Sequence, residues 1–138
     1  MSDCLFCNIV SGSIPSFKIY ETDETYCFLD IHPVNQGHVL VIPKRHSQNL
    51  LDIPSADWRH VAESVRVVAI AVEKALEADG INLMMNNREH AGQVIDHPHV
   101  HVIPRFKGDG LTLWGHHDYK AGEAEVVKQK IVASLTYT

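Results

Sequence analysis

Three histidines occupy alternate positions in residues 97–105, HPHVHVIPR. Imidazole can ligate a metal ion, transfer protons and, when neutral, act as a nucleophile near pH 7. Successive side chains of a β-strand point to opposite faces, so His97, His99 and His101 would project from one face. Three imidazoles on a half-buried face need hydrogen-bond partners, a ligand or a metal. The pattern therefore predicts a functional site rather than ordinary core packing.

A single metal ion held by all three histidines does not fit strand geometry. With a rise of about 3.3 Å per residue, His97 and His101 would lie roughly 13 Å apart. The three side chains therefore need separate roles. One role is nucleophilic attack on phosphorus through a phosphohistidine intermediate, with neighbouring donors stabilising the phosphoryl oxygens. Polar residues in the preceding segment 86–97, NNREHAGQVIDH, could supply such donors.

The cysteines suggest a second kind of site. Cys4 and Cys7 form a C-x-x-C pair, which in a reducing compartment indicates metal binding or redox chemistry. A redox motif of this kind follows a strand, and here the pair begins at residue 4, so we favour structural zinc completed by two histidines from elsewhere. Unbound thiols are the alternative. Cys27, inside the apolar run YCFLDI, is expected to be a buried core residue.

The segments that would position these residues form an α+β pattern, with one long helix packed on an antiparallel sheet. Val61, Val65, Val68 and Val72 have helical spacing and predict the long helix, from an N-cap at Ser55 to about residue 79 with Gly80 as its stop. Turn residues and apolar alternation give the other elements. These are a short helix over 4–10, strands over 17–22, 25–31, 37–44, 81–87 and 97–105, and a C-terminal helix over 122–135.

Length and charge limit the class of protein. The chain of 138 residues is 45% hydrophobic, which suits one globular domain. Its net charge of -5 and the lack of a Lys/Arg-rich run argue against binding to nucleic acid. The N-terminal segment lacks the features of a signal peptide, and no apolar run reaches the roughly 18 residues of a membrane helix. We therefore expect a soluble, cytoplasmic protein that binds no membrane.

Several motifs together resemble one family. Gln93, the spacing His97-x-His99-x-His101 and the following Pro104-Arg105 are similar to the histidine triad motif of the histidine triad (HIT) nucleotide-binding hydrolases and transferases. The resemblance extends to CLFCNIVSGSIPS, FLDIHPVNQGHVLVIPKRH and NLMMNNREHAGQ, and so covers nearly all of residues 4–105. It implies a HIT-like fold with a sheet of about five strands. Residues 1–138 would form a single HIT domain, with the triad core at about 4–105 and a tail over 106–138.

The resemblance implies a role for each polar site residue. His99 would attack the α-phosphate of a nucleotide substrate and form a covalent nucleotidyl-histidine. His101 would hydrogen-bond the phosphate or the leaving atom, and His38 would lie near the phosphate. Asn86 and Gln93 would position the phosphate and the nucleophile.

The same resemblance implies a nucleotide pocket and a zinc site. Asp30 would bond the ribose hydroxyls, since a carboxylate can accept two neighbouring donors. The purine would lie against apolar side chains for which plain core packing is the alternative, namely Phe6, Ile9, Ile14, Ile31 and Leu40. Structural zinc would be held by two thiolates and two imidazoles, from Cys4, Cys7, His46 and His97. The family also implies a homodimer.

Two segments depart from the family pattern or vary within it. Many members carry Ser or Thr after the glutamine, where its hydroxyl reaches the scissile phosphate, and this chain has Val94. We expect slower turnover or altered selectivity from that loss. The segment LWGHHDYK, with Trp114, His116 and His117, either reaches a neighbouring active site or forms a surface loop.

The expected function is hydrolysis of purine nucleoside phosphoramidates, or related nucleoside 5'-phosphate derivatives, with release of the nucleoside monophosphate. Hydrolysis of dinucleoside polyphosphates and a regulatory role with incidental hydrolysis are the alternatives. A ribose-binding carboxylate and apolar side chains around the base contact neither the hydrogen-bonding edges of the purine nor the leaving group beyond the phosphate. The sequence therefore does not determine whether adenine or guanine is preferred, nor which leaving group is attached to the phosphate.

Overall fold

The computed structural model describes residues 2–136. It contains one five-stranded sheet in the order β1-β2-β3-β5-β4, in which every neighbouring pair is antiparallel. This confirms the expected α+β class; Met1 and residues 137–138, at the ends of the expected domain, lie outside the described residues. The elements are α1 (Leu5–Val10), β1 (Lys18–Glu21), β2 (Thr25–Leu29), β3 (Val39–Pro43), α2 (Ser55–Leu76), β4 (Gly80–Met84), the 3-10 turn η1 (Glu89–Ala91), β5 (Val100–Arg105) and α3 (Glu123–Ala133).

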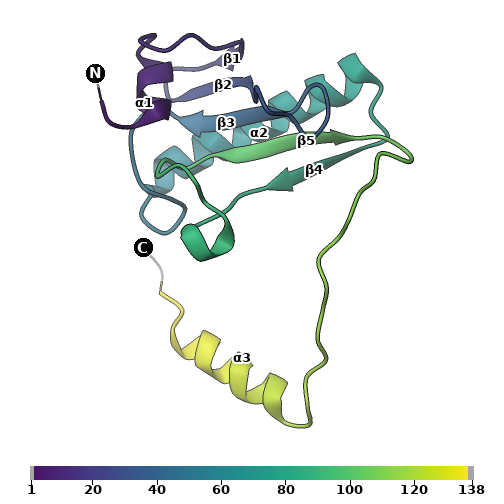
Figure 1. Ribbon diagram of the computed structural model, residues 1–138. Helices are drawn as coiled ribbons and strands as arrows, with labels where there is room; N and C mark the ends of the chain where they lie inside the picture. The colour runs from purple at the N-terminus through teal and green to yellow at the C-terminus, as the bar shows by residue number, and fades with distance from the viewer. Residues whose placement is uncertain (1, 137–138) are drawn as a thin grey trace.

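The long helix α2 covers one face of the sheet (Figure 1). Its valines at helical spacing are the ones that the sequence predicts to face the core, and all four are buried. They pack on alternate residues of the central strands, so that Val39 and Val41 of β3 and Val100 and Val102 of β5 lie in the same cluster. The resulting apolar layer fixes the register of both strands that carry the site.

The opposite face of the sheet is covered by α1. Phe6 and Ile9 of this short helix pack with Phe28, Leu40 and Ile42. Because both faces of β3 are covered, all five of its residues are buried. The histidine side chains lie on this second face, away from α2.

The strand that carries the histidines is shorter than expected. β5 begins at Val100 rather than at His97, and only His101 of the three histidines lies within it, opposite Leu40 of β3. Pro98 interrupts the ladder before this point, because proline has no N–H to donate. The alternation nevertheless continues, since the rings of His99 and His101 lie with centroids 5.2 Å apart.

Both ends of α2 differ from the expectation. Pro54 occupies the N-cap position, and Ser55 is the first helical residue, so Ser55 is not the cap. At the other end the helix stops at Leu76 because Glu77 adopts a left-handed conformation with φ of 52°. The N–H of Asp79 then donates to the carbonyl of Arg105, which draws the chain into the sheet, and Gly80 is the first residue of β4 rather than the helix stop.

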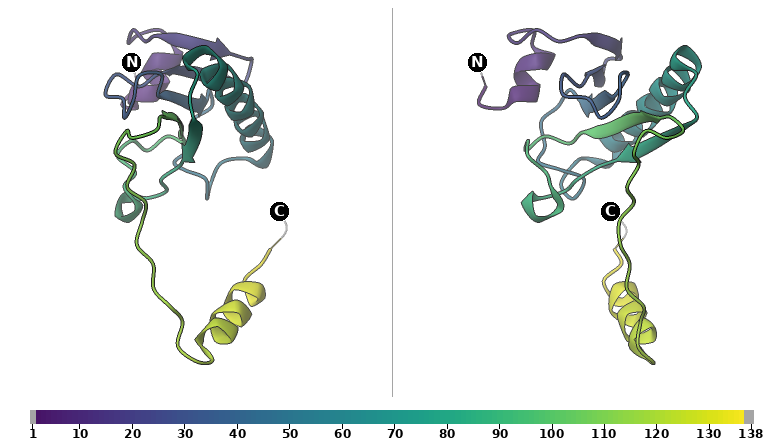
Figure 2. Two further views of the ribbon diagram at one scale, coloured as in Figure 1. Left: turned by 90° about the vertical axis from the view of Figure 1, so that its right-hand side faces the viewer. Right: turned by 45° about the vertical axis from the view of Figure 1, so that its right-hand side comes forward.

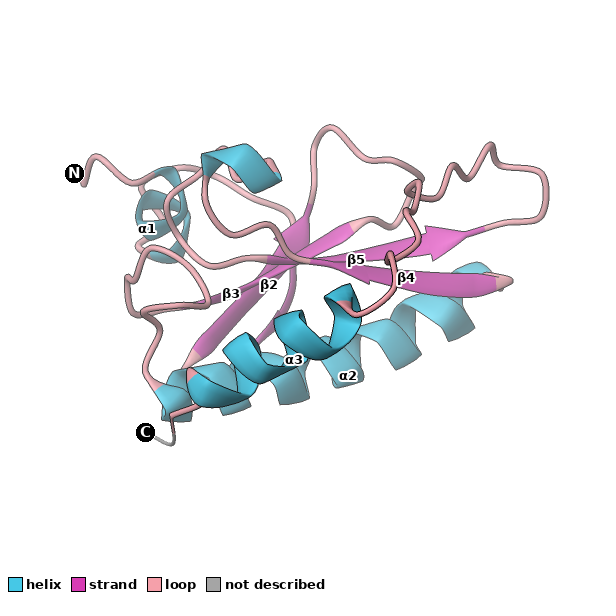
Figure 3. Cartoon of the chain, turned by 90° about the horizontal axis from the view of Figure 1, so that it is seen from below, coloured by secondary structure: helices cyan, strands magenta, loops and turns pink. Residues whose placement is uncertain are grey.

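The chain after β5 leaves the body as an extended arm that ends in α3. The helix confirms the expectation for the C-terminal segment, but none of its residues is buried. In Figure 1 the arm passes the β4 edge of the sheet. Both views of Figure 2 show α3 separated from the sheet. From below, α3 and α2 lie on the same side of the sheet (Figure 3). No helix within residues 2–136 is long and apolar enough to cross a membrane.

Candidate active site and metal-binding cluster

Three histidines and one carboxylate meet on the sheet face opposite α2. His38 precedes β3, His99 precedes β5 and His101 lies within β5, while Asp30 follows β2. The ring centroids of His38 and His101 are 5.1 Å apart, and the Nε2 of His38 lies 3.6 Å from Oδ2 of Asp30. Antiparallel pairing of neighbouring strands thus brings together residues that are far apart in the sequence.

The tautomer of His99 is set by the backbone. Its Nδ1 lies 2.7 Å from the carbonyl oxygen of His97, and because a carbonyl can only accept, Nδ1 must carry the proton. The lone pair is therefore on Nε2. The side chain is 4% exposed, and burial lowers the pKa of His99, which favours the neutral form. A neutral imidazole with its second nitrogen held by an acceptor is a competent nucleophile.

The same reasoning orders the protons of the other two imidazoles. The N–H of Val34 donates to Nδ1 of His38 over 3.1 Å, so the proton of neutral His38 is on Nε2. That Nε2 lies 2.8 Å from Nδ1 of His101 and donates to it. His101 then carries its own proton on Nε2, as a donor. Burial, with the charges of His99 and His38, lowers the pKa of His101 to about 4.

Asp30 keeps acceptor capacity beside the histidines. Its Oδ1 accepts the N–H of His32 over 2.8 Å, and its backbone N–H donates to the carbonyl of His38. These bonds fix the carboxylate at the end of β2, where it is half-buried. A carboxylate offers about four lone-pair sites, so further donors can be accepted.

The two amides expected to position a phosphate are bound within the loop before β5. The Nε2 of Gln93 donates to the carbonyls of Gln48 and Ile95 at 2.6 and 2.8 Å, and its Oε1 accepts the N–H of Arg88 at 2.7 Å. Both N–H groups of this buried amide are therefore engaged. Asn86 makes a longer contact of 3.4 Å from Nδ2 to the carbonyl of Gly92. Its Nδ2 is the freer donor of the two amides.

The apolar residues expected around the base divide into two groups. Phe6, Ile9 and Leu40 are 5, 7 and 6% exposed and belong to the core cluster under α1. Phe6 also meets the ring of His99 edge-on, with centroids 5.1 Å apart. Ile14 is half-buried, and Ile31 is 70% exposed beside Asp30. Only these last two offer much surface to a ligand.

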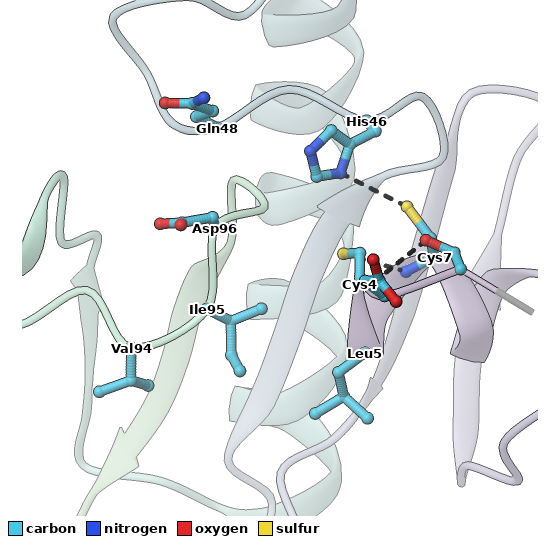
Figure 4. A pocket seen from close by; sticks show the side chains of 10 residues that line it. Cys4, Leu5, Cys7, His46, Gln48, Val94, Ile95 and Asp96 are labelled. Atoms are coloured by element: carbon cyan, nitrogen blue, oxygen red, sulfur yellow. Dashed lines mark hydrogen bonds between the residues drawn. The ribbon is translucent and has the colours of Figure 1, made fainter.

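Four side chains that the family resemblance groups as metal ligands do lie together. One donor atom of each, from Cys4, Cys7, His46 and His97, lies within 4.8 Å of all the others. The separations from sulfur to Nδ1 are 3.5 Å for Cys4 and His97, 3.6 Å for Cys7 and His97, and 3.5 Å for Cys7 and His46. In Figure 4, His46 points toward Cys7 across the mouth of a hollow. The cluster can hold a metal ion.

The geometry of His97 suits ligation. Its Nε2 donates to the carbonyl of Pro43 over 2.7 Å, which leaves the lone pair on Nδ1, the atom that faces the two sulfurs. Burial lowers the pKa of His97 to about 4, so the ring is neutral. Cys27 lies elsewhere and is fully buried, and burial raises its pKa to about 12. As expected, it is an inert core residue.

A hollow of about 610 Å³ opens beside the metal-binding cluster. Cys4 and His46 lie on one side of it, and the loop that carries Val94 and Asp96 forms another wall (Figure 4). Val94 is 84% exposed. Asp96 contributes a carboxylate to this wall.

The structure also reveals partners that residue patterns did not indicate. The carbonyl of Pro43 and the N–H of Val34 orient His97 and His38, and backbone groups leave no signal in residue type. Arg105 of the triad motif makes two bonds of 2.8 and 2.7 Å to the carboxylate of Asp109. Asn35 donates to that carboxylate as well, so the loop before His38 is tied to the end of β5.

Comparison with known proteins identifies relatives over most of the chain. A family model described as HIT domain matches residues 11–108. Protein hit of Bacillus subtilis is 39% identical over 137 residues, which cover 96% of this chain and 94% of that protein. Adenosine 5'-monophosphoramidase HNT1 of Candida albicans is 43% identical over 108 residues, covering 75% and 71%. Adenylylsulfatase HINT3 of Arabidopsis thaliana is 42% identical over 113 residues, and this chain spans 56% of its length.

Solved structures agree with the fold. The crystal structure of a HIT family member from Bacillus subtilis has a TM-score of 0.92 at 38% identity, covering 99% of this chain and 100% of that one. A HIT family protein from Bacillus anthracis gives 0.91 at 34% identity, covering 98% and 99%. A zinc-bound histidine triad family protein from Mycobacterium smegmatis gives 0.76 at 36% identity, covering 96% and 98%.

Proposed function

The chain belongs to the HIT domain family, and from this membership and the site geometry we propose that it hydrolyses nucleotides at the α-phosphate. The substrates would be purine nucleoside phosphoramidates or related nucleoside 5'-phosphate derivatives, and the product a nucleoside monophosphate. Relatives named as an adenosine 5'-monophosphoramidase and an adenylylsulfatase support this substrate class. The observation that carries the proposal is the bond from Nδ1 of His99 to the His97 carbonyl, which leaves Nε2 as a nucleophile.

In the first step, Nε2 of His99 forms a bond to the α-phosphorus while the bond from phosphorus to the leaving nitrogen breaks. The leaving nitrogen keeps the electron pair and takes a proton from solvent, while Nε2–H of His101 donates a hydrogen bond to the departing nitrogen. Formation of the phosphorus bond makes the ring of His99 cationic, and the His97 carbonyl accepts its Nδ1–H throughout. The chain of donors from Val34 through His38 keeps the His101 proton directed outward.

In the second step, water attacks phosphorus and displaces Nε2 of His99. The electron pair of the nitrogen–phosphorus bond returns to the ring, and the water releases its proton to solvent. Asp30 would hold the ribose by accepting hydrogen bonds from its hydroxyl groups, which keeps the nucleotide in place through both steps. Asn86 would contact the phosphate, since its amide is less engaged than that of Gln93.

We further propose that the metal-binding cluster is a structural zinc site. Tetrahedral zinc, with bonds of about 2.3 Å to sulfur and 2.05 Å to nitrogen, separates its sulfur and nitrogen ligands by roughly 3.6 Å. The sulfur–nitrogen separations of 3.5 and 3.6 Å in the cluster fit that geometry. Zinc with four protein ligands has no open position and would supply cross-linking alone. His97 would thereby be fixed, and with it the carbonyl that orients His99.

Replacement of the nucleophile tests the proposed activity. We expect His99→Ala to reduce AMP release from an adenosine phosphoramidate at least about 10³-fold, because a covalent route needs its nucleophile. His90→Ala is the matched control, since His90 is exposed in η1, outside the histidine cluster, and should retain wild-type rates. The measurement is steady-state AMP release, with guanosine phosphoramidate and dinucleoside polyphosphates as parallel substrates.

Equal rates for wild type and His99→Ala would refute the catalytic assignment. Trapping of labelled nucleotide on wild-type protein, absent from His99→Ala, tests the covalent intermediate separately. Faster cleavage of dinucleoside polyphosphates than of phosphoramidates would favour the alternative hydrolase. Tight nucleotide binding without turnover of any substrate would favour a regulatory protein.

The family resemblance also leads us to propose a homodimer and a cytoplasmic location. The edge strand β4 supports the first part, because its outer backbone groups are available for pairing with another strand. Sedimentation over a range of concentrations measures the oligomeric state, and a monomer at every concentration would refute it.

A further inference from the structure

The arm after β5 exposes apolar side chains that its own chain leaves uncovered. Trp114 and Leu113 are 88 and 65% exposed, and Ile131 and Val132 of α3 are 59 and 57% exposed. Within the described chain, every residue from 110 to 136 is exposed. Single exposed apolar residues are normal on a protein surface. Many exposed apolar side chains gathered in one segment instead indicate an interaction site.

One face of α3 is apolar. Ala124, Val127 and Ile131 recur at intervals of three and four, so they lie in one stripe along the helix. Gln129 lies on the opposite side. An isolated helix of 11 residues is marginal in water, and most helices of this length are stabilised by packing of an apolar face. The stripe therefore needs a surface to pack on.

The position of the arm is shared with solved relatives. The Bacillus subtilis and Bacillus anthracis structures superpose with TM-scores of 0.92 and 0.91 over 99 and 98% of this chain. Residues beyond Arg105 make up almost a quarter of the chain, so such scores require the arm to superpose as well. An arm without contacts would differ from one molecule to the next. Since the body of the same chain does not hold it, the contact must come from outside.

The body offers a surface of the complementary kind at its β4 edge. Two adjoining hollows of about 300 and 350 Å³ run between α2 and β4 and share Ala62, Val65 and Leu83 as lining residues. Leu83 and Met84 of the edge strand are 56 and 46% exposed. An apolar groove beside an unpaired strand edge is suited to a second copy of the same sheet and helix.

The relative placement of the elements identifies what α3 would meet. The arm passes the β4 edge, and α3 lies beyond that edge on the side of the sheet that α2 covers (Figures 1 and 3). A second sheet that continues across β4 places its own long helix on that same side, next to α3. We propose that α3 packs its apolar stripe against α2 of a second copy of the chain, and that α3 of the second copy packs in the same way against α2 of the first. This inference rests on the proposed dimer and goes beyond it.

Charge placed in the stripe tests the contact. We expect Ile131→Asp to raise the dissociation constant of the dimer at least about tenfold, because burial of the new carboxylate is unfavourable. Gln129→Asp adds the same charge to the other side of α3 and should leave the constant within about twofold. Sedimentation of the full-length proteins over a range of concentrations gives both values. An unchanged constant for Ile131→Asp would overturn the inference.

A crosslink identifies the surface that α3 touches. A photoreactive amino acid at position 131, in a mixture of isotope-labelled and unlabelled full-length chains, should give products of twice the chain mass that combine both labels. Digestion should place the crosslink in the Ser55–Leu76 helix. Crosslinks confined to one chain, or to another part of the partner, would overturn the inference.

These results separate the arm from the dimer and from catalysis. A dimer that withstands Ile131→Asp and gives no crosslink between chains would refute the role of α3 while leaving the proposed dimer intact. A chain that is monomeric at every concentration would refute both. AMP release measured on the same samples reports the proposed activity independently, because Ile131 and Gln129 lie outside the active site.

Discussion

The role of each histidine is set by the group that holds one of its two ring nitrogens. Carbonyls bind Nδ1 of His99 and Nε2 of His97, so the first exposes an Nε2 lone pair and the second an Nδ1 lone pair toward sulfur. His101 instead accepts a hydrogen bond from Nε2–H of His38 at its Nδ1 and presents its own Nε2–H as a donor. Three identical side chains thereby become the proposed nucleophile, the proposed metal ligand and the proposed hydrogen-bond donor to the leaving group. Residue spacing predicts that their roles differ, but only the backbone contacts assign the atoms.

Substitution of Val94 tests how much the missing hydroxyl at this position lowers the rate of turnover. Because the side chain is 84% exposed, its replacement should not disturb the fold. We expect Val94→Ser to raise kcat for an adenosine phosphoramidate roughly tenfold, equivalent to about 1.4 kcal/mol, the size of one hydrogen bond. Val94→Ala removes the same bulk without adding a hydroxyl and should not raise the rate. If the serine variant is no faster than wild type, the absence of the hydroxyl does not limit the rate of turnover.

The buried His101 predicts how stability depends on pH. Its pKa falls to about 4 in the folded protein, mainly through burial, with His99 and His38 opposing a further charge and Asp30 favouring it. In the unfolded chain the ring protonates near pH 6.5. The unfolded state therefore binds the proton first, and the free energy of unfolding decreases as pH falls from about 6.5 toward 4.

Comparison with His101→Asn isolates this contribution. An asparagine can still accept the hydrogen of His38 but does not titrate. We expect urea unfolding at pH 7, 6 and 5 to show a steeper loss of stability for wild type than for the variant. Parallel slopes would mean that His101 is not kept neutral by the fold.

At the scale of elements, α1 depends on contacts far from it in sequence. The helix has only six residues and carries Cys7, with Cys4 at its N-cap. A helix this short does not form alone in water. Phe6 and Ile9 anchor it to the sheet, and a metal ion in the cluster would join it to His46 and His97.

Metal removal should therefore act first on α1. If the cluster holds zinc, a chelator should lower Tm by roughly 8 °C, equivalent to about 2 kcal/mol. Amide hydrogen exchange should accelerate in Leu5–Val10 and change little in α2. Cys4→Ser should contain less zinc and show a smaller response to the chelator. A wild-type protein without zinc, whose Tm ignores the chelator, would contradict the proposed site.

The sequence predicts the types of the elements better than their boundaries. The spacing of valines correctly identifies α2, because apolar periodicity directly reflects which side faces the core. Its ends are decided by contacts that the periodicity does not encode, namely the left-handed Glu77 and the bond from Asp79 to Arg105. Likewise the alternation of histidines identifies their common face, whereas Pro98 delays the start of β5.

At the scale of the whole molecule, the sequence indicates the family, the sheet and the residues that cluster. Motifs separated by dozens of residues are informative together because the fold brings them to one place. The detached arm could not be predicted in the same way. A helix that packs within its own chain and a helix that packs elsewhere have the same apolar stripe, and only the arrangement in space distinguishes them.

The order of the strands also determines when the two groups of clustered side chains can assemble during folding. His38 and His101 are separated by 63 positions, and Cys4 and His97 by 93. Contacts between distant segments form late because loop closure must be overcome before they contribute. Neither the segment before α2 nor the segment after it contains a complete cluster. A fragment of the chain, or an intermediate in which β3 and β5 have not paired, would therefore lack both complete groups of side chains, which assemble only once these two strands pair.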